Sequence, residues 1–201
     1  KRIKPPVGAQ INWGHPLAQG LQRCYLMNEG GGRVARDLAR QDHASFASAP
    51  TPPTYDVSLF GKSLKFPNAT DAENGPITGY IPGKVFTWVV RFIPTNWSDY
   101  SSLVTHAGVS YMLMNVVTGS GSFWSPDGLG GVTLGITGLS LNRPYEIALV
   151  REGDSLTNGY KGYLNGVLQG QANSGVWTGA EGVRIGSRRD TVSQNLIGWM
   201  D

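Results

Sequence analysis

The segment from Tyr160 to Ala172 constrains the fold most strongly, because it has the pattern of two short strands joined by a two-residue turn. Asn165-Gly166 is the dipeptide whose residues most readily take the positive φ angles of a type I′ turn. Residues suited to pleated strands flank it on both sides. The sequence therefore predicts a tight antiparallel hairpin with its turn at Asn165 and Gly166.

A third strand is expected just before this hairpin, at Tyr145 to Arg151. Tyr, Ile and Leu alternate there with Glu, Ala and Val, which is the pattern of a strand covered at least partly on both faces. Together the three strands form a meander.

The composition extends this interpretation to the whole chain. The 201 residues include 28 glycines and 12 prolines and are only 15% charged, which is typical of many short strands joined by turns. No helical period runs longer than about two turns. We expect one all-β domain, with further strands at Leu21–Met27, Ser63–Phe66, Lys84–Ile93, Leu103–Val104, Tyr111–Val117, Val132–Ile136, Gly182–Gly186 and Leu196–Met200.

Charge, cysteine content and hydropathy exclude several classes of protein. The net charge is +3, but the basic residues are spread along the chain, which argues against nucleic acid as a partner. Cys24 is the single cysteine, so an internal disulfide is impossible. No apolar run is long enough to cross a bilayer, and the first residues lack the apolar region of a signal peptide. We expect no membrane partner.

Residues 1–20 differ from the rest, because they are basic and contain three prolines. Proline removes a ladder donor and favours extended backbone, so this segment is expected to form an arm. Ile11, Trp13 and Leu17 give the arm an apolar set that a solvated tail would not need. The arm lies either on its own domain or on a neighbouring molecule.

Five segments in a fixed order resemble the laminin-G-like, concanavalin-A-like jelly rolls. They are Gly20–Gly32 with Val34 and Asp37, Gly61–Phe66, Phe86–Phe92, Ala148–Leu168, and Val183–Gly186 leading to Ile197–Asp201. The resemblance implies a two-sheet antiparallel jelly-roll sandwich over residues 21–201, with the extended arm before it. The family continues into a closing strand beside the first strand, so the resemblance implies that the sequence stops short of that strand.

The same resemblance implies calcium as the one candidate cofactor, because such domains often hold it at the rim of the sandwich. Loop carboxylates are its ligands, and Asp37, Asp42 and Asp201 are the candidates, with ordinary turn aspartates as the alternative. The histidines are too far apart in sequence for a zinc site. The loop at 33–46 departs from the family's short turn, so the resemblance does not carry over a function that depends on the shape of that turn.

Catalysis is not expected. Jelly-roll glycoside hydrolases carry three acids on one strand, where period-two alternation points them into one cleft. The nearest patterns here are Glu152-Gly-Asp154, which has no third acid, and Asp71-Ala-Glu73, which lies in a turn-rich stretch.

Two aromatic segments, predicted as loops, form the candidate binding site. A flat ring beside amide and carboxylate groups can stack on a sugar or anchor a protein partner. The candidates are Asn96, Trp97, Asp99, Tyr100, Trp124 and Asp127, with packing on their own domain as the alternative.

Residues Pro5–Leu21 and Cys24–Gly32 also resemble the opening of laminin-G-like proteins encoded by tailed bacteriophages. This resemblance implies a non-enzymatic protein of the virion surface, either a capsid decoration or a tail component, with capsid or tail proteins and its own copies as partners. The alternatives are a glycan-binding lectin module of a bacterial surface or secreted protein and, less favoured, a glycoside hydrolase.

Overall fold

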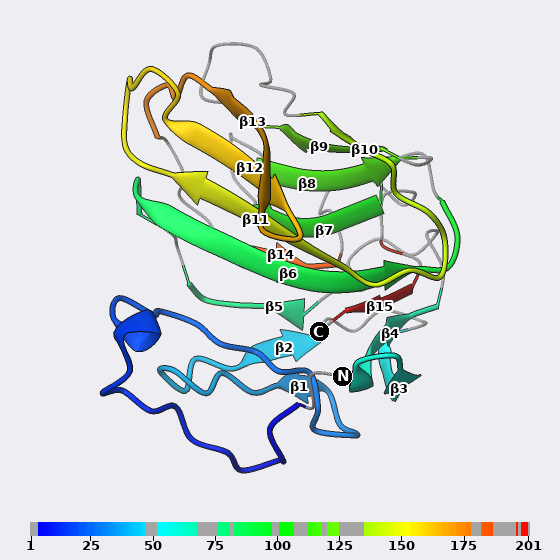
Figure 1. Cartoon of the computed structure of the whole chain (residues 1–201). Coiled ribbons are helices and arrows are strands. Elements are labelled where there is room, and N and C mark those ends of the chain that lie inside the picture. Colours follow the sequence, from blue (N-terminus) through cyan, green and yellow to red (C-terminus); the bar gives the residue numbers. More distant parts are fainter. Residues whose placement is uncertain are drawn as a thin grey trace.

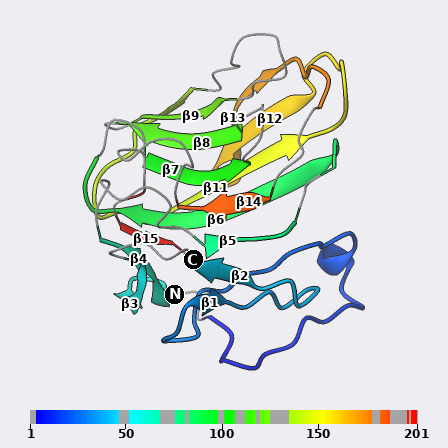
Figure 2. The same ribbon diagram turned by 180° about the vertical axis from the view of Figure 1, so that it is seen from behind.

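The computed structural model describes residues 4–46, 52–67, 76–80, 83–97, 101–106, 112–117, 120–124, 135–177, 182–186, 196 and 198–200. In this part of the chain the structure is all-β, apart from one turn of 3₁₀ helix, η1 (Pro16–Ala18). The strands form two antiparallel sheets that face one another (Figures 1 and 2). No described helix has the length and apolar character needed to span a bilayer.

The first sheet, called here the β6 sheet, contains the predicted meander. In spatial order its strands are β13 (Val167–Ala172), β12 (Tyr160–Leu164), β11 (Tyr145–Arg151), β6 (Phe86–Pro94), β15 (Gly198–Met200), β4 (Gly61–Phe66) and β3 (Thr54–Ser58). The long strand β6 lies in the middle and pairs with β11 on one side and β15 on the other. The central position predicted for this strand is confirmed.

The second sheet, called here the β7 sheet, is built from shorter strands. Its order is β1 (Val34–Ala35), β2 (Ala44–Phe46), β5 (Pro76–Ile77), β14 (Val183–Ile185), β7 (Ser101–His106), β8 (Met112–Val117), β9 (Ser120–Trp124) and β10 (Ile136–Thr137). Neighbours in this order pair antiparallel throughout.

The hydrophobic core lies between the two sheets. On β6 the buried residues Phe86, Val90 and Phe92 alternate with the more exposed Thr87 and Val89, so one face of the strand points inward. Apolar side chains of the neighbouring strand and of the facing sheet complete the core, among them Ile147, Leu149, Leu103, Val183 and Ile185. Full burial of each such side chain stabilises the fold by roughly 1.5–3 kcal/mol.

The hairpin is confirmed at its predicted residues. Leu164 pairs with Val167, and the two residues between them have positive φ angles, 49° at Asn165 and 81° at Gly166. Two hydrogen bonds hold the turn against β11: Asn165 N donates to Glu146 O at 2.7 Å, and Glu146 N donates to Asn165 Oδ1 at 2.9 Å. The turn therefore fixes the end of the whole meander.

Two of the expected elements are different in the structure. Leu21–Met27 is not a ladder strand, because its one bridge joins Tyr25 to Asp37. Its other backbone groups bond to the loop that follows, through Leu38 N to Cys24 O, and to the arm before it, through Leu21 N to Ala18 O and Lys4 Nζ to Leu26 O. Ser122–Trp124, predicted as loop, belongs to β9. The short strands β1, β2 and β3 were not expected either, since β1 and β2 are too brief to show a period and β3 carries Asp56 at its centre.

The remaining strand predictions agree with the structure where it describes them. Ser63–Phe66 lies within β4, and the predicted strand at Lys84–Ile93 largely coincides with β6. Of the predicted strand Val132–Ile136, the structure describes Gly135 and Ile136, and Ile136 belongs to β10.

The arm, described from Lys4 onward, lies outside both sheets and runs along one end of the sandwich (Figure 1). Its first described residues contact the domain: Lys4 Nζ donates to Leu26 O at 2.7 Å and to Lys62 O, and Asn28 Nδ2 donates to Pro5 O at 2.9 Å. Further along, Trp13 is 53% exposed and Leu17 85% exposed. Only part of the arm's apolar set is therefore covered.

We predict that Gly166→Val lowers the free energy of unfolding by more than about 1 kcal/mol, because a β-branched residue resists a positive φ. Chemical denaturation measures the change. Gly31→Val is the matched control, since Gly31 has a φ outside the left-handed region and open space around a Cβ. Equal unfolding midpoints for the two variants would contradict the prediction.

Candidate functional site

A cavity of about 890 Å³ opens between residues 17–27 and strand β6. Its floor is formed by core side chains of the β7 sheet, Val104, Val183 and Ile185. One side is Val85 together with β6 from Phe86 to Val90, and the other is the extended segment Leu21–Tyr25. We call this cavity the groove.

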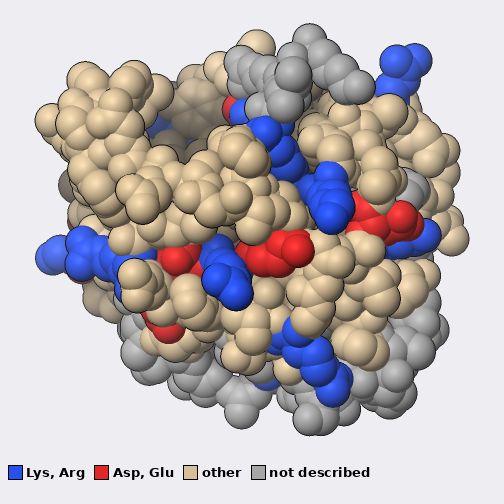
Figure 3. All heavy atoms as spheres, turned by 90° about the horizontal axis from the view of Figure 1, so that it is seen from below, with Lys and Arg blue, Asp and Glu red and all other residues tan. Residues whose placement is uncertain are grey.

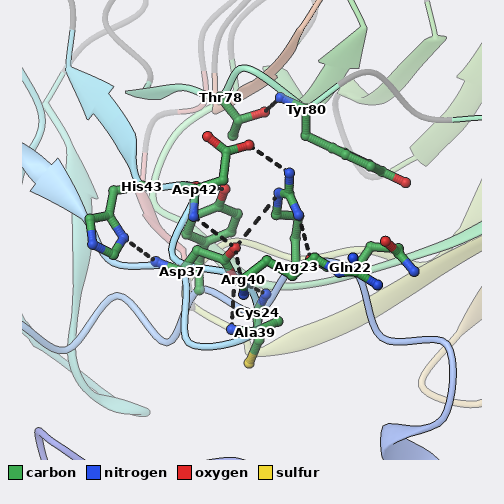
Figure 4. Close-up of polar contacts among 11 residues, drawn as sticks. Gln22, Arg23, Cys24, Asp37, Ala39, Arg40, Asp42, His43, Thr78 and Tyr80 are labelled. Atoms are coloured by element: carbon green, nitrogen blue, oxygen red, sulfur yellow. Dashed lines mark hydrogen bonds and ion pairs between the residues drawn. The ribbon is translucent and has the colours of Figure 1, made fainter.

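Asp37 holds the wall of the groove in place. Its carboxylate accepts four backbone N–H groups: those of Cys24 and Ala39 on Oδ1, both at 2.9 Å, and those of Arg40 and Asp42 on Oδ2, at 3.1 and 3.3 Å (Figure 4). Asp37 is only 2% exposed. Because a buried charge must be paired or hydrogen-bonded, this arrangement ties the loop 37–42 to the wall.

Arg23 links this network to the groove. Its Nη2 donates to Asp42 Oδ2 at 2.6 Å, its Nε lies 3.6 Å from Asp37 Oδ2, and its Nη1 donates to Gln22 O at 2.7 Å. The guanidinium also lies over the ring of Tyr80, 4.5 Å from the centroid (Figure 4). A flat cation on an aromatic face is a favourable contact, which fixes both side chains.

Gln22, Arg23, Thr78 and Tyr80 line one end of the groove, and Asp42 is paired with Arg23 behind them. We call these five residues the polar end of the groove. Thr78 Oγ1 accepts the N–H of Tyr80 at 3.1 Å. Tyr25 lies beside this set and donates its hydroxyl to Asp42 O at 2.9 Å. Burial raises the pKa of Tyr25 far above its usual value, and the charges of Asp37 and Asp42 raise this pKa further, so Tyr25 acts as a neutral donor.

The structure brings together two of the three calcium candidates. Asp37 and Asp42 are neighbours, but Arg23 lies between them and backbone donors fill the carboxylate of Asp37. Asp201 lies outside the described residues. Within the described ranges, no group of three His, Cys, Asp or Glu residues is placed to hold a metal ion.

The predicted aromatic site is only partly described. Asn96 is exposed and accepts the N–H of Trp97 at 2.9 Å, while Trp97 is half-buried and packs against the core of its own domain. Trp124 is in β9, where the structure describes the backbone alone. Asp99, Tyr100 and Asp127 lie outside the described residues. Grouping of these residues into one site stays a prediction.

The acids considered for catalysis are engaged in structural contacts. Glu152 pairs with Lys161, and Asp154 accepts from Arg151 Nη2 at 2.9 Å and from the N–H of Trp177 at 3.1 Å. The hydrogen bond from Arg151 holds the pKa of Asp154 below its usual value, as does the bond from Trp177. Asp71 and Glu73 lie outside the described residues.

Sequence reasoning missed the polar end of the groove. Leu21, Arg23 and Tyr25 alternate with Gln22 and Cys24, which marks Arg23 as a charge on an apolar face. A charge at such a position needs a buried partner, but Asp37, Asp42 and Tyr80 are distant in sequence and the pattern does not indicate them.

The surface around the arm carries charges of both signs. Figure 3 shows Lys and Arg side chains interspersed with Asp and Glu across this face of the described residues. The face therefore lacks the single-sign field that a nucleic acid backbone would require.

The comparisons with known proteins support the fold. Neither a protein-family model nor a curated protein sequence matches the chain. Among solved structures, domain 4 of AbnA, an extracellular arabinanase from Geobacillus stearothermophilus in complex with arabinotriose, has a TM-score of 0.54 at 17% identity, covering 75% of this chain and 73% of that one.

Two larger proteins show the same fold in part. Trypanosoma rangeli sialidase in complex with sialic acid matches with a TM-score of 0.59 at 15% identity, covering 88% of this chain but 29% of that chain. The binding domain of Paraclostridial Mosquitocidal Protein 1 matches with a TM-score of 0.54 at 12% identity, covering 85% of this chain and 46% of that one. The chain is thus an all-β sandwich similar to domains of carbohydrate-active and binding proteins.

We predict that Asp37→Asn lowers the free energy of unfolding by at least about 2 kcal/mol, because an amide places N–H groups against backbone donors. Chemical denaturation of the variant measures this loss. Asp56→Asn is the control, since Asp56 is a half-exposed aspartate that pairs with Lys65 at 3.0 Å and accepts one backbone N–H, so its unfolding midpoint should fall much less. A midpoint for Asp37→Asn equal to that of the control would show that the network does not hold the wall.

Proposed function

We propose that this domain is a non-catalytic carbohydrate-binding module and that the polar end of the groove holds the sugar. The observation that carries the proposal is the juxtaposition, at the mouth of a cavity, of the Tyr80 ring with the Arg23–Asp42 pair. Aromatic rings contact the apolar faces of sugars, while paired donors and acceptors bind their hydroxyls. The likeness to the arabinanase domain bound to arabinotriose supports the same class of ligand.

The charges at the polar end favour a neutral sugar. Arg23 contributes one positive charge, while Asp37 and Asp42 contribute two negative charges, so the set carries a net charge of about −1. An anionic sugar would meet a carboxylate at the mouth, whereas a neutral sugar can donate a hydroxyl to Asp42 and accept from Gln22. The proposal places the domain in a secreted or cell-surface protein.

We predict that Tyr80→Ala weakens binding of arabinotriose or of another neutral oligosaccharide at least tenfold, because the ring contact is lost. Isothermal titration calorimetry against a panel of neutral and acidic oligosaccharides measures the affinity. Tyr163→Ala on β12 is the matched control, since it removes a tyrosine of the β6 sheet that does not line the groove. Equal affinities for both variants, or a preference for acidic sugars, would contradict the proposal.

We further propose that the domain does not hydrolyse its ligand. Glu152 and Asp154, the described acids considered above for the glycoside hydrolase mechanism, are held in salt bridges. The purified protein should release no reducing sugar from arabinan, β-glucan, galactan or chitin. Release that disappears in Glu152→Gln or Asp154→Asn would overturn this statement.

A second candidate function, attachment to a virion surface, is favoured by the exposed apolar residues of the arm. Trp13 and Leu17 are largely uncovered in the single chain, which suits a segment that packs on a capsid or tail protein. Deletion of residues 1–16 should then leave the melting temperature nearly unchanged while abolishing incorporation into particles. Normal incorporation of the shortened protein would remove this candidate.

A further inference from the structure

The outer face of the β6 sheet carries a row of apolar side chains. Paired residues of an antiparallel sheet point to the same face. The pairing aligns four such residues across four neighbouring strands: Val89 of β6, Ala148 of β11, Tyr163 of β12 and Leu168 of β13. We call them the apolar row. The row spans roughly 14 Å, and Figure 1 shows its four strands side by side in front of the β7 sheet.

The apolar row points away from the core. Val90 and Ile147, which adjoin it along the strands, are buried between the sheets, and successive residues of a strand point to opposite faces. Val89 is 58% exposed and Leu168 is 47% exposed, so water contacts the side chains at both ends of the row. A further strand beside β6 would widen this face rather than cover it.

The charged groups that border the row are paired within the chain. On one side Arg91 Nε lies 2.8 Å from Glu146 Oε2, and on the other side Lys161 pairs with Glu152. Neither pair has a net charge, so this face offers no field of one sign to a strongly charged partner. A second copy of the same face can approach it without like-charge repulsion.

The row is complementary to itself about one particular two-fold axis. An axis parallel to the strands and midway between β11 and β12 reverses the order of the row. Tyr163 of one copy then faces Ala148 of the other, and Leu168 faces Val89, so each large side chain meets a smaller one, as close packing requires. An axis along the row would instead set Tyr163 against Tyr163 and Ala148 against Ala148, which places two large side chains together beside a gap.

The residues on either side of the row suit the same axis. It brings Glu146 of one copy opposite Asn165 of the other, so a carboxylate meets an amide. It also brings Lys161 opposite Val150, on which the aliphatic part of the lysine side chain can lie. Among these described residues, no two groups of like charge face one another.

We propose that this face is a self-association surface and that two copies pack their β6 sheets outer face to outer face about this axis. Four strands and about six residues along each give a face of roughly 20 Å by 20 Å, so the dimer buries on the order of 800–1,000 Å². Interfaces of this size are weak and transient, so dimers form only at high protein concentration. The polar end of the groove shares no residue with the apolar row.

The test measures the oligomeric state of the full chain by sedimentation equilibrium. The natural sequence should pass from monomer to dimer between roughly 10 μM and roughly 1 mM. Val89→Lys alone and Leu168→Glu alone should each stay monomeric over this range, because each sets a charge against an apolar side chain of the second copy. Both positions are exposed, so the fold tolerates either substitution.

A double variant tests the axis itself. Val89→Lys/Leu168→Glu should dimerise again, since each lysine then faces a glutamate of the other copy. The two positions lie at opposite ends of the row, roughly 14 Å apart within one chain, so this rescue requires a second copy.

Val57→Lys is the matched control, because Val57 is 70% exposed on β3, at the far edge of the same sheet, and should dimerise like the natural sequence. A natural chain that is monomeric over the whole range would overturn the proposal, and this is the outcome expected if a sugar or an unrelated protein occupies the face. A single variant that dimerises as tightly as the control, or a double variant that stays monomeric, would overturn it as well.

Discussion

The carboxylate of Asp37 is the interaction on which this end of the molecule depends. Its four backbone donors come from both Leu21–Tyr25 and the loop that follows, two segments that share only one bridge. A ladder strand would satisfy the same backbone groups with a neighbouring strand. Here one side chain replaces that ladder, so the wall of the groove stands beside β6 without being paired to it.

Local patterns explain which parts of the fold could be predicted. The hairpin at Asn165-Gly166 and the strand Tyr145–Arg151 were found with their exact residues, because turn chemistry and alternation act over a few positions. Leu21–Met27 has the same kind of alternation, yet its partner is a side chain rather than a strand. No local pattern distinguishes the two cases, which is why the prediction failed there.

The candidate site was less predictable than the fold for the same reason. Arg23, Asp42 and Tyr80 meet from three segments separated by loops, and each residue alone has an ordinary sequence context. Aromatic residues in predicted loops gave a stronger signal, but Trp97 packs on its own core and Trp124 belongs to a strand. A binding surface of this kind depends on which loops the sheets bring together.

The groove contains two environments that differ in polarity. Along Phe86–Val90 the floor is aliphatic and the edge consists of backbone groups, so a sugar there would leave its hydroxyls without partners, at a cost of about 1–3 kcal/mol for each unsatisfied group. At the polar end the balance reverses, because an apolar side chain there would remove Arg23 and Asp42 from water without offering a hydrogen bond. The polar end is therefore the part of the groove that suits the proposed sugar.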